Sequence, residues 1–240
     1  MRYYFRLSAA VFLSFLILEA SPVKIWAAGT ASRCLVTVKG IKLKDMDNAW
    51  FNVPIKEVKL DLGKPDQTIS FKNDGRIPAG RYKNFKIILS ETLQVSGHDG
   101  DNYTTEGGQL EVGGVARRMS ELPGDITSMT ESTKTWNKNS EGLMTVKINL
   151  DFEDRDDVME IYGSRDLEEP FKVKAKSNLV FVISVNLEDT INFAWPDSLA
   201  RGIPSHNVMY FLPPTSVTEV SISSDKYTTS FDSDYIDISF

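Results

Sequence analysis

The chain has 240 residues, a formal net charge of −6 and one cysteine. Its acidic balance and the lack of a basic block argue against nucleic acid and against anionic membrane surfaces as partners. Because one cysteine cannot form an internal disulfide, the fold must rest on its apolar core, which a chain of this length can supply.

The first residues have the order of a secretory signal peptide. Arg2 and Arg6 form a positive segment, residues 9–18 are apolar but too short to span a bilayer, and small residues follow at 27–31. We therefore predict a signal peptide over 1–29, with an uncleaved N-terminal anchor as the alternative. The mature chain, with no later membrane span, is expected to be soluble and extracytoplasmic: periplasmic, on the cell surface or secreted.

Three cleavage sites fit the small-residue stretch. Cleavage after Ala28 places Trp26 at the −3 position, so cleavage after Gly29 or Ala31 is preferred.

Cys34 allows three interpretations. It can be a small apolar residue of the first strand, a thiol that pairs with a second copy, or a lipid attachment site, although Arg33 before it fits a lipoprotein signal poorly.

The first predicted strand changes parity partway along. Val36 and Val38 share one parity, Ile41 and Leu43 share the other, and the change falls at Gly40. A β-bulge at this glycine would keep both pairs facing inward.

Pro78 and Gly80 predict a turn, because proline presets φ and glycine accepts a positive φ. A single strand is predicted to run on from it to Val95. Its apolar face holds Phe85, Ile87, Leu89, Leu93 and Val95, and its polar face holds Asn84, Lys86, Ser90, Thr92 and Gln94.

The other alternating or apolar runs are short and bounded by glycine, proline or acidic turns. The run at 144–152 alternates most cleanly, and 179–187 is apolar on both faces, so it is predicted to lie at the centre of a sheet. The remaining predicted strands are 58–62, 68–71, 103–112, 158–162, 171–175, 217–222 and 235–240.

These elements predict an all-β fold, an antiparallel β-sandwich of prealbumin or immunoglobulin type over 34–190. Residues 113–142 lack sustained periodicity and are predicted to form a long loop insertion, with a short helix near 116–121. Residues 191–240 are predicted to be a C-terminal β extension packing on the sandwich.

The order of the early strands, with Ile77-Pro78-Ala79-Gly80-Arg81-Tyr82 before Phe85-Lys86-Ile87-Ile88-Leu89, resembles a bacterial family. That family consists of secreted prealbumin-like (transthyretin-like) β-sandwiches and is known only as a domain of unknown function. The resemblance covers about 34–190, and 115–142 and the tail after 190 depart from it. It implies an extracytoplasmic binding or surface module and supplies no catalytic residues.

Two acidic loops carry hard oxygen ligands of the kind that calcium prefers. The first holds Asp99, Asp101 and Asn102 beside Gly100, and the second crowds five carboxylates into 151–157. Calcium is therefore a possible ligand, although neither loop has a full calcium-binding pattern and solvated turns are the alternative. No other cofactor is predicted.

Two tryptophans allow a binding or a packing role, and a third is assigned to the core. Trp136, among Lys134, Lys138 and hydrogen-bonding residues, can grip a sugar or protein partner or can anchor its loop to the sandwich. Trp195 is a weaker candidate that is better explained as core or domain seam, and Trp50 is predicted to be core.

No catalytic residue is predicted. His98 and His206 are far apart, and no metalloprotease, nucleophile-elbow or phosphate-loop motif occurs. The first hypothesis is a non-catalytic module that binds a protein or glycan at the cell surface. The alternatives are a structural subunit of a surface filament or envelope complex assembled through its C-terminal strands, and a hydrolase with an unrecognised carboxylate pair.

Overall fold

The computed structural model describes residues 29–114, 126–150, 159–188, 190–194, 208–211, 216–224, 227–232 and 235–239. The described residues form strands and connections without a helix, so the all-β prediction is confirmed. None of them, accordingly, forms a helix able to cross a membrane. The predicted signal peptide up to residue 28, the helix near 116–121 and the acidic turn at 151–157 lie outside the described residues.

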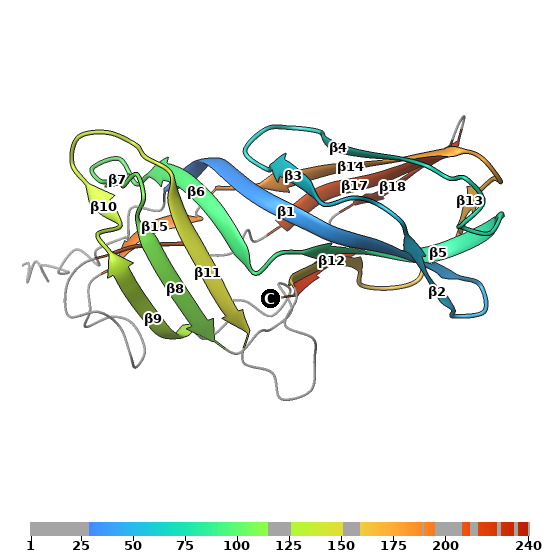
Figure 1. The fold of residues 1–240 in the computed structure, drawn as a ribbon, viewed down its shortest axis with the longest axis horizontal. Helices are drawn as coiled ribbons and strands as arrows, with labels where there is room; N and C mark the ends of the chain where they lie inside the picture. The colour runs from blue at the N-terminus through green and yellow to red at the C-terminus, as the bar shows by residue number, and fades with distance from the viewer. Residues whose placement is uncertain are drawn as a thin grey trace, which may run out of the picture.

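Most strands belong to one large mixed sheet, which runs in the order β19-β12-β5-β1-β6-β11-β8-β9 (Figure 1). Short strands β2, β3, β7, β10 and β13 attach beside this path. The bounds are β1 Thr30–Asp45, β2 Trp50–Val53, β3 Val58–Asp61, β5 Gly80–Leu89, β6 Thr92–His98, β7 Tyr103–Thr104, β8 Gln109–Gly114, β9 Ile126–Thr133, β10 Trp136–Asn137, β11 Met144–Leu150, β12 Met159–Gly163, β13 Phe171–Val173 and β19 Ile236–Ser239.

A second, four-stranded sheet lies over β1, β2, β5 and β12, which gives the two layers of a sandwich (Figure 1). Its order is β18-β17-β14-β4, so the apolar run predicted to be central does lie inside a sheet, as β14. The bounds are β4 Gln67–Lys72, β14 Asn178–Asn186, β17 Ser216–Ser224 and β18 Tyr227–Asp232, and a separate two-stranded sheet joins β15 Ile191–Ala194 to β16 Val208–Phe211.

Strand β1 carries partners along both of its edges. The register of β1 with β5 shifts between Val38 and Gly40, which confirms the bulge predicted from the change of parity. The valines before the bulge and Ile41 and Leu43 after it are all buried. The extra residue at the bulge therefore lets both halves of the strand face one core.

The strand predicted to run unbroken to Val95 is two strands. β5 and β6 follow the same edge of β1 but are separated at Ser90 and Glu91, where the ladder gains two residues relative to β1. Two extra residues preserve the alternation of period two, so the predicted apolar residues on both sides of the break are buried. Beyond this point β12 pairs with β5, and β11 pairs with β6.

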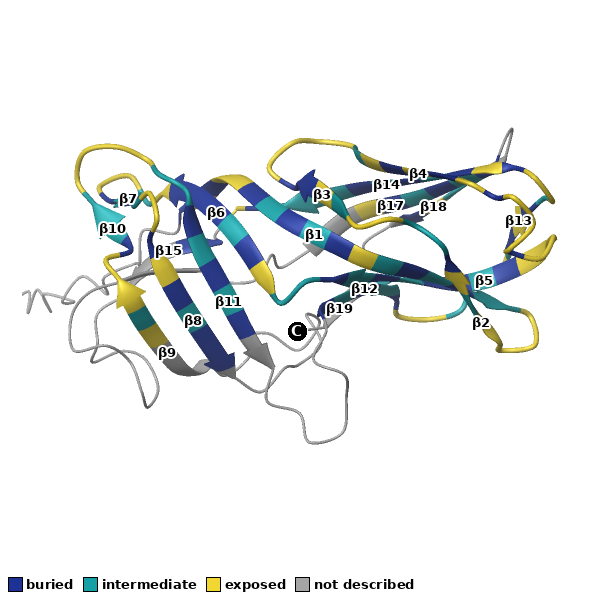
Figure 2. Cartoon of the chain, in the orientation of Figure 1, coloured by how far each residue is buried: buried dark blue, intermediate teal, exposed yellow. Residues whose placement is uncertain are grey.

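The core between the layers is built around aromatic rings. Phe231 of β18 contacts Phe85 of β5 edge to face, with ring centroids 4.7 Å apart, and also contacts Phe171 of β13. Phe181 of β14 is fully buried. Figure 2 shows buried and exposed residues alternating along the strands, as expected where one face of each sheet meets the core.

Two predicted segments differ from the structure. The 113–142 insertion is not a long loop: β9 pairs with β8, and β10 pairs with β7. Residues 191–240 are not an extension on a finished sandwich, because β17 and β18 make half of the second sheet and β19 completes an edge of the large sheet. Strand β9 is defined by its partner rather than by alternation of its own, whereas the C-terminal strands were predicted but not their places in the two sheets.

The turn before β5 is held by side chains. Gly80 opens β5 without the positive φ that was predicted, and the positive φ falls at Gly75, at 102°. Buried Asn73 donates to the carbonyl of Ile77 at 2.9 Å and accepts from the amides of Gly75 and Ile77 at 3.1 Å. The Tyr82 hydroxyl donates to the carbonyl of Pro78 at 2.8 Å, which closes the turn.

Candidate binding surface

The outer side of β2, β1, β5 and β12 presents polar and aromatic side chains in cross-strand rows. One row pairs Asn52, Lys42, Lys86 and Tyr162 in that order across the four strands. The residues on either side of this row along the strands, such as Ile41 and Ile87, point inward and are buried. We call this surface the aromatic–lysine face and define it as Lys42, Lys44, Trp50, Asn52, Lys86, Glu160 and Tyr162.

Trp50 lies on this face and is 40% exposed, so the prediction that it belongs to the core is wrong. It opens the edge strand β2, and its Cα partner is Lys44, which also faces outward. With Met46, it is one of the two large apolar side chains that are exposed in the described part of the chain. Both belong to the β1–β2 hairpin.

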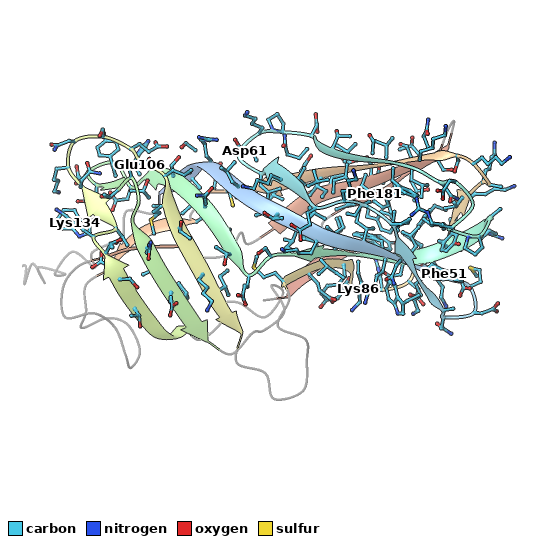
Figure 3. All side chains as sticks on the ribbon, viewed as in Figure 1. Phe51, Asp61, Lys86, Glu106, Lys134 and Phe181 are labelled. Carbon is cyan, nitrogen blue, oxygen red and sulfur yellow. The ribbon has the colours of Figure 1, made fainter. Side chains whose placement is uncertain are left out.

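Lys86 sits between the two aromatic rings of the face. Its Nζ lies 5.5 Å from the ring centroid of Trp50 and 5.9 Å from that of Tyr162, and it donates to Oε2 of Glu160 at 2.7 Å. Figure 3 shows Lys86 on the side of the large sheet away from the second layer, and Phe181 between the layers. Cation–π contacts and the ion pair thus hold a lysine beside an exposed indole.

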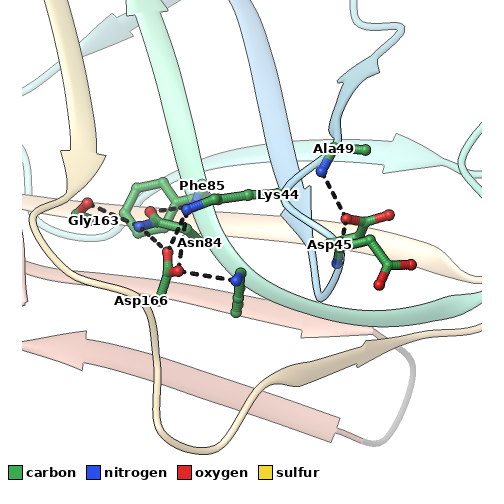
Figure 4. Close-up of polar contacts among 9 residues, drawn as sticks. Lys44, Asp45, Ala49, Asn84, Phe85, Gly163 and Asp166 are labelled. Carbon is green, nitrogen blue, oxygen red and sulfur yellow. Dashed lines mark hydrogen bonds and ion pairs between the residues drawn. The ribbon is translucent and has the colours of Figure 1, made fainter.

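Next to the face, Asp166 gathers three donors from two strands (Figure 4). Its Oδ1 accepts from Lys44 Nζ at 3.0 Å and from Asn84 Nδ2 at 3.1 Å, and its Oδ2 accepts from Lys83 Nζ at 3.1 Å. Asn84 also donates to the carbonyl of Gly163 at 3.0 Å. These bonds fasten the connection after β12 against β1 and β5.

Burial alone would raise the pKa of Asp166, but the hydrogen bonds from Asn84, Lys44 and Lys83 outweigh it, so this pKa lies below its usual value. The carboxylate therefore stays ionised and keeps two lysines in fixed positions at the margin of the aromatic–lysine face. A rigid sheet that carries an exposed indole, fixed ammonium groups and an amide is suited to binding a ligand.

The predicted calcium loop is organised by its own hydrogen bonds. The Asp99 carboxylate accepts from the backbone amides of Asp101 and Asn102 at 3.2 and 2.8 Å and from the Asn102 side chain at 3.1 Å. Among the residues that the structure describes, no group of three or more histidine, cysteine, aspartate or glutamate side chains could hold a metal ion. The prediction of a calcium site at Asp99, Asp101 and Asn102 therefore gains no support from the structure.

The structure describes one of the two tryptophans that were candidate ligand contacts. Trp136 of β10 is half-buried and packs against the core, with Lys134 Nζ 4.9 Å from its ring centroid. This packing supports the anchoring role over the binding role. Trp195 lies outside the described residues.

Cys34 is buried within β1, and Asp61 lies beside it. Burial, and secondarily the Asp61 charge, raise the pKa of the thiol to about 12. The residues directly before it pair with β6. A lipid-bearing N-terminal cysteine or a thiol that pairs with a second copy would disrupt this packing, so the contacts favour the role of a small apolar core residue.

Sequence reasoning placed Lys86 on the polar face of its strand but did not find the site. The signal available in the sequence was the alternation around Lys42 and Lys86, and only the register brings these residues and Trp50 together. In comparisons with known proteins, no family model, curated protein or solved structure matches the chain.

Proposed function

We propose that the chain is an exported, non-catalytic β-sandwich module of prealbumin or immunoglobulin type that binds a glycan or protein at the cell surface. The N-terminal pattern of the sequence supports export, and the two-layered all-β fold supports the sandwich. The aromatic–lysine face is the proposed contact surface.

The observation that carries this proposal is the exposure of Trp50 beside Lys86 and Tyr162. An indole that could add to the core instead lies in solvent on a regular sheet, and tryptophan is among the residues that contribute most at binding sites. The neighbouring ammonium and carboxylate groups supply polar contacts around it.

The test is binding of the exported protein to glycan arrays and to cell-surface extracts, with Trp50→Ala as the variant. We expect Trp50→Ala to reduce retention at least about tenfold, as for a central aromatic contact. Met46→Ala is the matched control, because it removes an exposed apolar side chain from the same hairpin. Equal retention of both variants and the wild type, or turnover of a bound substrate by the wild type, would contradict the proposal.

Export also bears on the cleavage site. Gly29 exchanges two backbone hydrogen bonds with Ile191, at 2.7 and 3.0 Å, and Ala31 is buried. Cleavage after Gly29 or after Ala31, the two sites preferred from the sequence, would remove the bonds of Gly29, whereas cleavage after Ala28 would keep them. We therefore propose Gly29 as the first residue of the mature chain, which N-terminal sequencing of the exported protein would test.

A second candidate function, a subunit of a surface assembly, is favoured by strand β18. Among the described strands it pairs only with β17. Thr228 and Ser230 on it are exposed, and no charged residue lies between Tyr227 and Phe231. Such an edge can pair with another chain. Size-exclusion chromatography should then show an oligomer that Ser230→Lys converts to a monomer, and a monomeric wild type would count against this candidate.

A further inference from the structure

The aromatic–lysine face holds two like charges directly opposite each other. Lys42 of β1 and Lys86 of β5 are Cα partners on the outer side of the sheet. Like charges at opposed positions of neighbouring strands destabilise a sheet. Glu160 neutralises Lys86 at 2.7 Å, but no carboxylate whose side chain the structure describes lies within ion-pair distance of Lys42.

The other lysines around Lys42 have carboxylate partners. Lys44 and Lys83 lie on or beside the face, and Asp166 neutralises part of their charge. The other acidic side chains described near the face are Glu160 on β12, at the far side of Lys86 from Lys42, and Asp45 and Asp47 in the β1–β2 hairpin. Lys42 therefore presents an ammonium group without a described carboxylate partner on the same face as the exposed indole of Trp50.

We propose that this face binds an acidic glycan, a chain of uronic acid units, with Lys42 contacting a carboxylate and Trp50 stacking against a sugar ring. The inference rests on the proposed binding function and adds the class of ligand. The indole matches the apolar C–H face of a pyranose, and the ammonium matches its carboxylate through a charge-assisted hydrogen bond. An acidic peptide is less well matched. Peptides commonly bind by adding a strand at a sheet edge or by lying in a groove, and neither mode uses the outward face of a sheet, where Lys42 lies.

The test compares two forms of one ligand with the whole exported protein. Oligogalacturonate carries the carboxylates, and its methyl-esterified form has the same sugar rings without the charge. Isothermal titration is expected to show binding of the free acid that weakens as salt increases, and binding of the ester at least about tenfold weaker.

Lys42→Gln is expected to weaken binding of the free acid about tenfold and to leave the affinity for the ester unchanged. Lys72→Gln is the matched control, because Lys72 is an exposed lysine on β4 of the second sheet. Thermal melting of each variant reports folding separately. Since Lys42 faces Lys86, we expect Lys42→Gln to melt no lower than the wild type.

Equal binding of acid and ester, or an unchanged affinity of Lys42→Gln, overturns the inference. If only neutral glycans bind and Trp50→Ala abolishes their binding, the proposed function stands and the inference fails. If polyglutamate binds in place of the uronate, the ligand is an acidic peptide and the inference also fails. If no glycan or protein ligand is retained at all, both proposals fail.

Discussion

Single buried polar residues hold the turns that lead into the central strands. Asn73 is fully buried, and both ends of its amide bond the backbone around it. Asn84 was predicted on the polar face of its strand, and it does face outward, but the residues after β12 cover it. Alternation therefore gives the direction of a side chain and not what lies above it.

Replacing Asn73 tests its role in the turn. Asn73→Ala would leave the amides of Gly75 and Ile77 without their acceptor, so we expect the free energy of unfolding to fall by about 3 kcal/mol. Asn52→Ala on exposed β2 is the control and should change it by less than about 0.5 kcal/mol. Chemical denaturation measures both, and similar values for the two variants would contradict the assignment.

Cys34 gives a prediction for alkaline pH. Its pKa is about 12 in the folded chain against 9.0 for the exposed thiol, so the unfolded chain loses its proton first. Between these values the folded state binds more protons, and stability falls as pH rises from 9 towards 12. Cys34→Ala should remove the part of this loss that begins near pH 9, while Tyr82, whose pKa is also raised to about 12, contributes only above pH 10.

The same burial predicts that a thiol reagent labels Cys34 only after unfolding. Labelling of the native protein at the rate of a free thiol would contradict the burial of this residue.

At the scale of elements, the alternation of apolar and polar residues predicted those strands that bury one face of their own side chains in the core. The runs that became β11 and β14 were predicted, since Met144, Val146, Leu179 and Phe181 alternate with less buried neighbours. Strand β9 was missed, because its sequence ITSMTEST shows no period of two and its pairing with β8 makes it a strand. The proposed binding surface could not be predicted for a related reason, since it depends on the register that sets Lys42 beside Lys86.

Asp166 fixes one element to two others, and its removal should loosen that attachment. Because its pKa is lowered in the folded chain, its stabilising contribution is present above the usual aspartate pKa and is lost as pH falls through the lower, folded value. Asp166→Asn should destabilise the protein by less than about 1 kcal/mol, because the group is partly exposed to solvent, and should reduce this acid dependence. Hydrogen exchange at 163–167 should become faster, and Glu168→Gln, at an exposed neighbour, should leave it unchanged.

At the scale of the whole molecule, the two ends of the chain complete the layers. Strand β1 lies at the centre of the large sheet, β19 forms one of its edges, and β17 and β18 make half of the second sheet. The boundary predicted near residue 190 therefore does not separate a finished sandwich from an appendage.

Truncation after residue 215 tests this arrangement. The shortened chain lacks β17, β18 and β19 and leaves Phe85 and Phe171 without the ring of Phe231. We expect no cooperative unfolding transition, whereas the point variant Phe231→Ala should fold and be destabilised by about 3–5 kcal/mol. A truncated chain that unfolds cooperatively would show that the C-terminal strands are dispensable.

The pairing of β4 with β14 has a consequence for synthesis and for the proposed export. Lys72 pairs with Asn178, and the strand on the other side of β14 ends only at Ser224, so the second layer cannot close until the chain as far as Ser224 is present. Until then, no completed sandwich opposes extension of the chain. Delayed closure of this kind keeps a polypeptide able to pass through a narrow pore before it folds on the far side.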